Sequence, residues 1–455
     1  MKLSKAYFPV SNNSSIPEGR KFYPQYFIAI CVVYLILASA LALEARYGIL
    51  DEDFHLIASR AFANAGVNLT SLYKHVPPTG VASHIWFALW MRLFPGIDFI
   101  GLRLITCATL LLVAGFTYVH IKTLSVARQQ KILAASWFML VCPYFFLSVS
   151  TIETEGPSLI FLFIGLLLLS ISRFQRLLPF FLGCLLLGIT TIARFYYIPL
   201  LPAVFVVLVL TDWEYYVQYG LKDVLVKRGL LYTAIGISLL PLVGLILLWG
   251  GLTPPAFHQW SKLRSGVSFN ALRPFTAFAL TGIYLTPIVL VNAYWQSKAL
   301  IRTVLIGVLA ALLLTLCRVN FFHDSSSVDD VFSGPIEHGL AWIEARGELV
   351  LKLALFVVYS LSFISLGIII EQISTYIRAK DYTDKGLVFS IVFVLFFIVS
   401  QAFVGGNHPF FERYLIQPWP FIGYILVQLF PGFLNGRTYL ILIAYTILSV
   451  LILVK

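Results

Sequence analysis

The sequence predicts an all-α polytopic membrane protein with about 13 transmembrane helices and amphipathic helices on its outer face. The composition indicates this class, because 59% of the residues are hydrophobic and only 12% are charged. The mean hydropathy is +0.89, whereas a soluble domain is close to half apolar and a quarter charged. Long apolar runs also recur along the chain, with polar segments between them.

The first apolar run, residues 26–43, is not followed by a small-residue cleavage site, so we predict a retained helix rather than a signal peptide. No soluble domain is expected after the last run, and residues 1–455 are interpreted as one transmembrane domain with a cytoplasmic tail at 1–25. The adjacent runs 178–193 and 197–211 could form a broken or re-entrant pair. The other predicted spans are 99–118, 132–149, 157–171, 231–250, 276–293, 303–318, 349–370, 387–404, 415–429 and 438–454.

The net charge of +11 is concentrated on the segments that lie in the cytoplasm when the N-terminus is cytoplasmic. This is the positive-inside pattern, in which excess positive charge sets the orientation of the chain in the lipid bilayer. The charge therefore does not predict a nucleic-acid partner. The five cysteines lie in or beside apolar runs without CxxC spacing. They predict buried thiols, and neither disulfides nor a zinc site.

Three outer connections, 44–98, 251–275 and 319–348, are long or polar, whereas the cytoplasmic ones are short and basic. The chain shows no matching halves with interrupted helices, which transporters built of inverted repeats contain. We therefore expect the function on the outer side. Loop 319–348 is interpreted either as a lid or as a flexible surface loop.

The first outer loop contains the motif DEDFH, with Asp51, Glu52, Asp53 and His55. The structural interpretation is that acidic residues favour the positive end of a helix dipole. The chemical interpretation is that Asp51 and His55 share one helix face, where a carboxylate can take a proton from a hydroxyl or hold a divalent cation.

Two surface helices are predicted around this motif, over 53–65 and over 82–96, joined by the turn HVPPTG. The second is rich in Trp and Phe, as suits a helix that lies along the bilayer surface. The apolar face of the first would comprise Phe54, Ile57, Ala58, Ala61 and Phe62.

A carboxylate pair outside the first transmembrane helix, a surface helix, a Pro-Pro turn and a second surface helix resemble the GT-C glycosyltransferases. These are integral membrane enzymes that use polyprenyl-phosphate sugars. The motif is similar to the D-E-x-F-H of the dolichol-pathway alpha-1,2-glucosyltransferase family, here Asp51, Glu52, Phe54 and His55. Bacterial aminoarabinose transferases share the outline. Because ASRAF follows the histidine, where the glucosyltransferases have a glutamine-rich continuation, the resemblance favours the superfamily over a particular sugar.

The resemblance implies that Asp51 is the general base that deprotonates the acceptor hydroxyl, so that the sugar leaves its phosphate with inversion. Glu52 and His55 would position the base, the acceptor or a metal. Glu155, in the second outer loop, has the place of an acid that faces the first-loop acid in GT-C members. Asp51 and Glu155 could share a divalent cation, Mg²⁺ or Mn²⁺; the alternatives are simple loop solvation and arginines that replace the metal.

The donor phosphate requires positive charge. Arg194 interrupts apolar helices at the outer boundary, where a buried arginine is costly unless paired, with snorkelling to lipid headgroups as the alternative. His258, Lys262 and Arg264 offer further cations in the loop after the seventh span, and a guanidinium suits bidentate phosphate binding. Arg413, with the tyrosine after it, resembles an Arg-Tyr pair of GT-C members, although it could simply pair with the preceding glutamate.

The expected function is that of an inverting glycosyltransferase in cell-envelope or other glycan biosynthesis. It would move a sugar from a polyprenyl-phosphate donor to a lipid-linked glycan, a polysaccharide or a protein on the periplasmic or lumenal face. The expected membrane is the bacterial inner membrane or, alternatively, the endoplasmic reticulum. The rival hypothesis is a lipid-linked sugar flippase or secondary transporter, which would place polar residues near the bilayer midplane.

Overall fold

The computed structural model is all-helical over the residues that it describes. These are residues 31–32, 36–40, 42–43, 52–140, 142, 144–257, 269–292, 298–317, 335–379, 382, 384–403, 412–430, 437–438, 440–445 and 447. No strand occurs among them. The all-α class is therefore confirmed for the described part of the chain.

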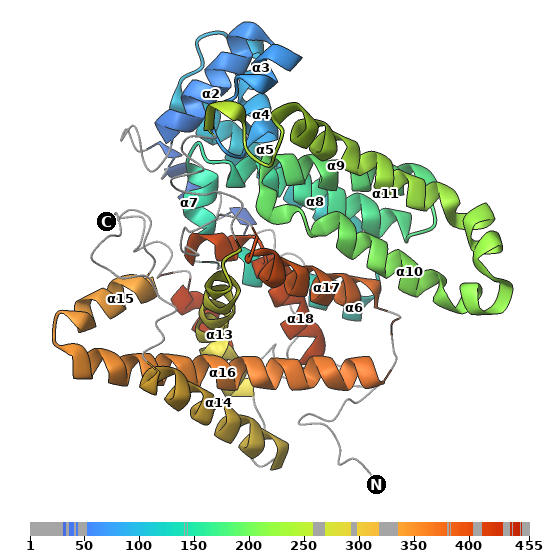
Figure 1. The fold of residues 1–455 in the computed structure, drawn as a ribbon. Helices are drawn as coiled ribbons and strands as arrows, with labels where there is room; N and C mark the ends of the chain where they lie inside the picture. Colours follow the sequence, from blue (N-terminus) through green and yellow to red (C-terminus); the bar gives the residue numbers. More distant parts are fainter. Residues whose placement is uncertain are drawn as a thin grey trace.

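Three helices of the first outer loop form one end of the molecule (Figure 1, blue). They are α2 (Glu52–Ala65), α3 (Leu69–Tyr73) and α4 (Val81–Leu93). α2 begins with two acidic residues, which the helix dipole favours, and Gly66 ends it with a left-handed φ of 81°. α2 packs against α4, so the two predicted surface helices form one unit.

The buried face of α2 differs in part from the predicted one. Ala58 and Phe62 are buried as expected, but Glu52, His55 and Ser59 are buried with them. Phe54 and Ile57 are instead 37% and 66% exposed, and this part of the expected apolar face points outward, where a membrane boundary accepts it. The polar face points inward because its charged and polar groups have partners there, as the site below shows.

The first half of the bundle lies next to this loop. It comprises α5 (Phe99–Ile121), α8 (Glu155–Ser172), α9 (Leu177–Ala193), α10 (Leu200–Tyr219) and α11 (Leu221–Trp249). α9 packs against both α8 and α11, and Figure 1 shows α8 to α11 running in nearly the same direction. The short 3-10 turn η2 (Phe195–Tyr197) separates α9 from α10, at the break expected between these two runs.

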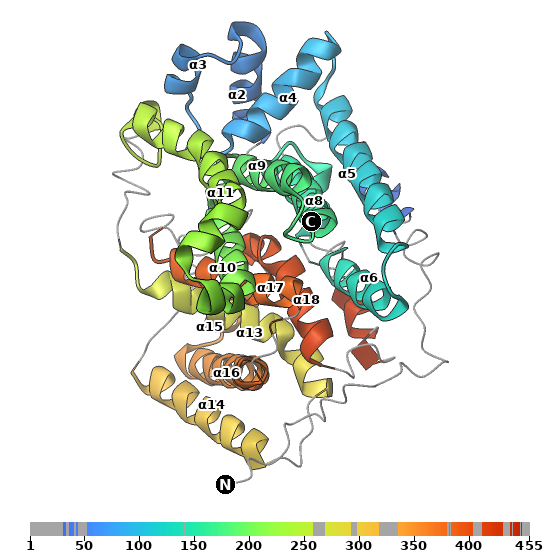
Figure 2. The ribbon, with the colours of Figure 1, turned by 90° about the vertical axis from the view of Figure 1, so that its right-hand side faces the viewer.

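The second half of the bundle contains α13 (Leu272–Asn292), α14 (Lys298–Leu316), α16 (Glu348–Arg378), α17 (Lys385–Ser400) and α18 (Trp419–Leu429). α14 and α13 both pack against α16. In Figure 2, α8, α9 and α16 are viewed nearly along their axes, so helices of both halves share one direction. The remaining elements are α6 (Val126–Leu140), α7 (Phe145–Ser150), η3 (Pro255–Phe257), α15 (Pro335–Glu344) and η5 (Glu412–Ile416).

Six described helices are long and apolar enough to cross a membrane. Four shorter apolar helices accompany them, and the expected number of thirteen spans is not confirmed.

The predicted spans 26–43 and 438–454 lie largely outside the described residues. The predicted span 132–149 is divided into α6 and α7; the sequence contains Pro143 at the division, and a proline lacks the N–H that a continuous helix needs. The six spans are 99–121, 155–172, 195–213, 221–249, 272–292 and 348–378.

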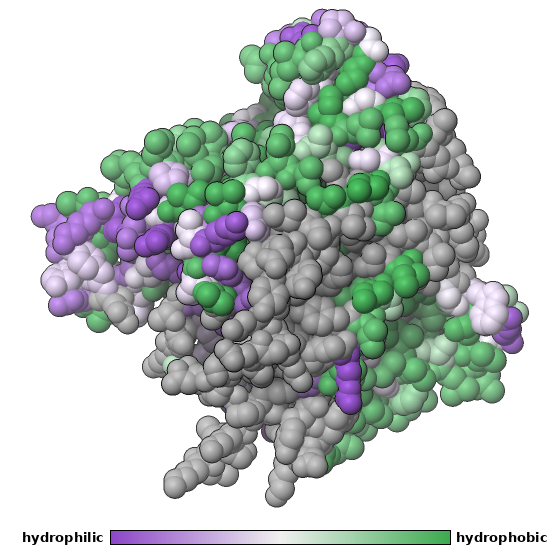
Figure 3. All heavy atoms as spheres, turned by 180° about the vertical axis from the view of Figure 1, so that it is seen from behind, coloured by the Kyte–Doolittle hydropathy of each residue, from purple (hydrophilic) through white to green (hydrophobic). Residues whose placement is uncertain are grey.

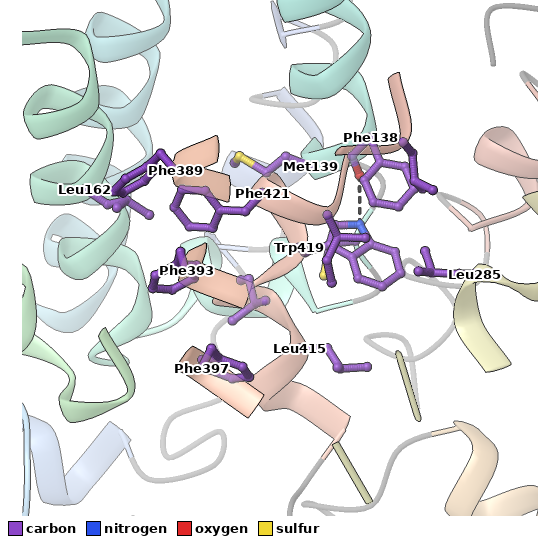
Figure 4. Packing of buried hydrophobic residues seen from close by; sticks show 14 of the residues in the cluster. Phe138, Met139, Leu162, Leu285, Phe389, Phe393, Phe397, Leu415, Trp419 and Phe421 are labelled. Atoms are coloured by element: carbon purple, nitrogen blue, oxygen red, sulfur yellow. Dashed lines mark hydrogen bonds between the residues drawn. The ribbon is translucent and has the colours of Figure 1, made fainter. Parts of the chain in front are cut away.

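Aromatic packing holds α6, α17 and α18 together (Figure 4). The rings of Phe138 and Trp419 stack with centroids 4.7 Å apart, and the Trp419 Nε1–H donates to the Phe138 carbonyl over 2.9 Å. Phe393 and Phe421 lie 4.3 Å apart beside them. This packing fixes the position of α18 and of η5, the turn before it, which contains Tyr414.

Apolar side chains also cover the outside. Leu240 and Leu247 of α11 are 60% and 77% exposed. Figure 3 shows hydrophobic residues over most of the coloured surface, with hydrophilic residues gathered where α10 meets α11 and over the first outer loop. Such an apolar belt requires lipid around it, so the chain is an integral membrane protein.

Candidate functional site

A buried ion pair anchors the start of α2. Glu52 pairs with Arg103 of α5, and the Arg103 Nε–H donates to Glu52 Oε1 over 2.8 Å, so that the contact is bidentate. The same carboxylate oxygen accepts the backbone N–H of Ile152 at 2.7 Å. Arg103 is 0% exposed and Glu52 is 2% exposed. Because buried charges are tolerated only when they are paired and hydrogen-bonded, this pair joins α2, α5 and the second outer loop.

A second buried ion pair lies at the start of α8. Glu155 is the first residue of this helix, and its Oε1 accepts from Arg194 Nη2 over 2.5 Å. Arg194 Nη1 donates to Thr154 Oγ1 over 2.7 Å. Arg194 is only 5% exposed. Its guanidinium is therefore paired inside the protein, which argues against snorkelling to lipid headgroups.

Three histidine rings from separate segments form a hydrogen-bonded chain between these ion pairs. His55 Nδ1 lies 2.8 Å from His84 Nε2, and His84 Nδ1 lies 2.9 Å from His75 Nε2. At the other end, His55 Nε2 lies 3.4 Å from the Glu153 Oε2. All four side chains are buried. The chain thus runs from the second outer loop through α2 and α4 to the segment before the Pro-Pro turn.

The turn that follows requires glycine at residue 80. Gly80 has a φ of 91°, and a Cβ there would lie 2.4 Å from Thr154 Cγ2 and 2.8 Å from His84 Cε1. Ser83, at the start of α4, donates through its hydroxyl to the Thr154 carbonyl over 3.0 Å. The turn is therefore seated tightly on the second outer loop, and this seating positions His84.

Two of the rings are held neutral. Burial lowers the pKa of His75 to about 3, and burial lowers the pKa of His84 well below its usual value, with neighbouring His75, His55 and Arg194 adding to the effect. Burial has this direction because it disfavours the charged imidazolium. A neutral ring has one N–H donor and one acceptor nitrogen, which is what each link of the chain uses.

Arg194 also faces an aromatic pair. Its guanidinium carbon lies 5.6 Å from the Tyr196 ring centre and 5.7 Å from that of Tyr414, and the two rings are 4.5 Å apart. The Tyr196 hydroxyl lies 3.4 Å from Nη2 of Arg273, in the first turn of α13. The tyrosines thus connect two arginines that come from opposite halves of the bundle.

Arg273 has unsatisfied donors. It is 2% exposed, and its Nη2 contacts Tyr196 Oη and Gln401 Oε1, each over 3.4 Å. Its Nε and Nη1 are buried and have no hydrogen-bond partner in the described part of the chain. Gln417 is 0% exposed, and neither side-chain polar atom has a partner there. Such groups are costly unless an anion or another polar group meets them.

The structure brings four of the sequence-predicted residues into one buried cluster, connected through residues 152–155: Glu52, His55, Glu155 and Arg194. Asp53 is exposed. The remaining candidates are outside the described residues, namely Asp51, His258, Lys262 and Arg264, together with the side chain of Arg413. Their roles stay predictions.

Asp51 and Glu155 were the expected ligands of a divalent cation, and the surroundings of Glu155, the described one of the two, do not favour such an ion. Glu155 already faces the Arg194 guanidinium, whose positive charge opposes a second cation at the same carboxylate. Among the residues with a described placement, no group of three or more His, Cys, Asp and Glu has the arrangement of a metal site. We therefore derive no step through a metal.

Sequence inspection missed Arg103, Arg273, His75 and His84. The first two had the signal that singled out Arg194, because each is a lone charge in or beside an apolar run. The histidines gave no comparable signal. His75 lies 9 positions from His84 and His84 lies 29 positions from His55, so only the packing of α2 on α4 brings them together.

A surface pocket of about 300 Å³ lies between α2 and α4. Arg60 and Arg92 line it, and Glu52, His55 and Arg194 do not. The pocket therefore lies apart from the buried cluster and is not included in the candidate site.

No protein-family model, curated protein or solved structure matches this chain. The chemistry of the site must therefore be inferred from its own geometry.

We expect Glu52→Gln to destabilise the fold strongly. The substitution keeps the shape of the side chain but leaves the Arg103 charge buried without a carboxylate, which costs about 3–5 kcal/mol. The double variant Glu52→Gln/Arg103→Met should recover part of this loss, since it removes the unpaired charge. The melting temperature in detergent measures both effects, and a Glu52→Gln variant as stable as the wild type would contradict the structural role of the pair.

Acid should also destabilise the first outer loop. The pKa of His75 is about 3 and that of His84 is also lowered, against an ordinary value of 6.5. Below pH 6.5 the unfolded chain therefore binds protons that the folded chain does not. Stability is retained above pH 6.5 and is lost below it, by up to about 1.4 kcal/mol per pH unit for each ring.

Melting temperatures in detergent between pH 7.5 and pH 5 measure this dependence. His75→Phe keeps an aromatic ring at this position but cannot titrate, so its melting temperature should vary less with pH. An equal pH dependence in the variant and the wild type would show that His75 does not contribute.

Proposed function

We propose that this chain is an inverting GT-C-type glycosyltransferase. It moves a sugar from a polyprenyl-phosphate donor to a hydroxyl of a lipid-linked glycan, a polysaccharide or a protein at the outer face of the membrane. The observation that carries the proposal is the buried Arg273, whose Nε and Nη1 donors lack partners in the described part of the chain. A donor phosphate would supply the missing acceptors.

The charge around Arg273 favours an anionic ligand. The nearby Arg194 is neutralised by Glu155, whereas Arg273 contacts only the neutral Tyr196 and Gln401 in the described residues. The segments 258–268 and 404–411, which adjoin these elements in sequence, contain no Asp or Glu, and 258–268 adds Lys262 and Arg264. The next two residues, Glu412 and Arg413, add no net charge. A net positive charge at a membrane boundary is suited to a phosphate headgroup.

The location of the cluster favours a lipid-linked donor. Arg273 lies in the first turn of α13, a candidate span, and Arg194 follows the shorter apolar helix α9, directly before the candidate span 195–213. An isoprenyl tail can lie along the exposed apolar surface while the phosphate meets the arginines. The two tyrosines between the arginines offer aromatic faces of the kind that stack on sugar rings or isoprenyl units.

The acceptor side is supplied by the first two outer loops. Asp51 directly precedes Glu52, and Glu52 is held by Arg103 and by the Ile152 backbone. In the proposed reaction Asp51 accepts the proton of the acceptor hydroxyl, and the oxygen then displaces the phosphate from the anomeric carbon. Glu52 and His55 act by positioning, since their described contacts are to other protein groups.

Sugar transfer in proteoliposomes tests this proposal. The assay supplies radiolabelled polyprenyl-phosphate sugars and a crude extract of lipid and glycan acceptors. Asp51→Asn should lower the rate by at least about 100-fold, because a general base contributes that much. Arg273→Met should lower it by a similar factor, because the charge that stabilises the leaving phosphate is lost.

Arg302→Met is the matched control, because Arg302 is an exposed residue of α14 and its variant should transfer at the wild-type rate. Equal transfer by all three variants would remove both residues from the mechanism. If the wild type transfers no label but moves the lipid-linked sugar across the bilayer, the transporter hypothesis replaces the enzyme.

A further inference from the structure

The surface pocket between α2 and α4 combines positive charge with an apolar lining. Arg60 of α2 and Arg92 of α4 line it, and the apolar part of the lining includes Leu56, Met91 and Phe99. Its volume of about 300 Å³ is at the lower end of the range for small-molecule sites, so it suits the headgroup of a lipid rather than a whole lipid. None of the residues assigned a role in sugar transfer lines it.

The sequence of α2 places a charged group and apolar neighbours on one stripe. Leu56, Arg60 and Ala63 are four and then three positions apart, so they lie on the same face of the helix. All three line the pocket, as does Asn64, four positions after Arg60. The guanidinium of Arg60 therefore comes from the same stripe as apolar side chains, as an amphipathic ligand requires.

Arg92 meets this stripe from α4. Its Nε donates to the Ala63 carbonyl over 2.7 Å, and a Cβ at Gly66, the residue that ends α2, would lie 3.4 Å from Arg92 Nη2. Gly66 thus leaves room for the guanidinium at the end of α2. One donor of Arg92 is used within the protein, and no described residue hydrogen-bonds to its Nη groups.

No carboxylate in the described part of the chain pairs with the two arginines, and Arg60 has no hydrogen bond there either. The acidic residues nearest to the lining in sequence are Asp53 and Asp98. Asp98 accepts the Gly101 N–H at 2.7 Å and caps α5. Two guanidinium groups thus present donors to the same cavity, and such groups match the oxygens of a phosphate.

The pocket lies at the boundary of a candidate span. Phe99 is the first residue of α5 and of the span 99–121, and Figure 2 shows α4 leading into the upper end of α5. Leu93 and Phe94, at the end of α4, are 57% and 53% exposed, and Phe116 of α5 is 66% exposed. Exposed apolar groups beside arginines are typical of the zone where lipid headgroups meet hydrocarbon.

We propose that this pocket binds the phosphate of a net-anionic phospholipid of the surrounding bilayer. The headgroup lies between Arg60 and Arg92, and the acyl chains run along the exposed apolar side chains of α4 and α5. A zwitterionic headgroup would bring its own cation close to two arginines, which disfavours it. A free phosphate would leave the apolar lining in contact with water.

The lipid holds the first outer loop on the bilayer. Its phosphate joins α2 to α4, and its chains extend the contact along α5. It is distinct from the sugar donor, because Arg194 and Arg273 do not line the pocket. Binding of this lipid is therefore independent of sugar transfer.

Native mass spectrometry of the full chain tests the site. The protein in detergent is mixed with equal amounts of phosphatidylglycerol and phosphatidylcholine that have the same acyl chains. We expect the wild type to bind one phosphatidylglycerol with at least about tenfold preference, and Arg60→Gln/Arg92→Gln to lose this preference. Phosphatidylglycerol should also raise the melting temperature of the wild type more than that of the double variant, because a ligand stabilises only the state that binds it.

Two control variants separate this pocket from other positive charge. Lys74→Gln removes an exposed cation of the same loop that does not line the pocket, and Arg273→Met removes the arginine proposed for the donor phosphate. Both should keep the wild-type preference. If the double variant fails to fold, Arg60→Gln alone serves, and Ala63→Phe, which fills the cavity and keeps both arginines, should lose the preference as well.

Equal binding of the two lipids by the wild type, or an unchanged preference in both Arg60→Gln and Ala63→Phe, would overturn the proposal. Displacement of the lipid by inorganic phosphate would reduce the pocket to a site for small anions and would also count against it. Loss of the preference in Lys74→Gln would show that the loop binds through its general charge. Loss in Arg273→Met would place the lipid at the donor site instead.

Discussion

The pairing of buried charge where apolar helices begin and end is the constraint on which this structure depends. Glu52 and Arg103 are both almost completely buried, and neither is tolerable there alone. Their contact, with the Ile152 N–H, joins the start of α2 to α5 and to the second outer loop. The position of DEDFH directly after the first apolar run is thereby explained in part, since one of its acids neutralises an arginine inside the protein.

The second ion pair extends the same principle. Glu155 and Arg194 join the start of α8 to the break between α9 and α10, and the histidine chain meets the same loop at Glu153. The described contacts of residues 52–84 and 152–155 therefore form a connected polar layer at one end of an apolar bundle. Within the described part of this layer, Arg273 differs from the other two arginines because no carboxylate neutralises it.

The sequence predicted the all-α membrane class, because apolar runs and low charge suffice for that. It also predicted four members of the cluster, since Glu52, His55, Glu155 and Arg194 are charged or titratable groups where apolar helices begin or end. It did not predict that Phe54 and Ile57 of α2 are exposed while Glu52 and His55 are buried. Periodicity distinguishes an apolar from a polar face, but at a lipid boundary polar groups can point inward when they have partners. Here Arg103 and His84 are those partners.

The remaining contacts depend on tertiary packing that no local pattern encodes. Arg273 and Tyr196 are 77 positions apart, and the histidine chain exists only because Gly80 lets the turn close on Thr154. The number of spans was also harder to predict than their existence. A run such as 132–149 is apolar enough for one span, yet the chain divides it into α6 and α7.

The most direct test is whether Arg273 holds a lipid phosphate. Native mass spectrometry of the full chain can compare the binding of a polyprenyl phosphate with that of the corresponding polyprenol, in the wild type and in Arg273→Met. We expect the wild type to prefer the phosphate and Arg273→Met to lose this preference by at least tenfold. Equal binding of phosphate and alcohol by the wild type, or an unchanged preference in the variant, would contradict a donor site at Arg273.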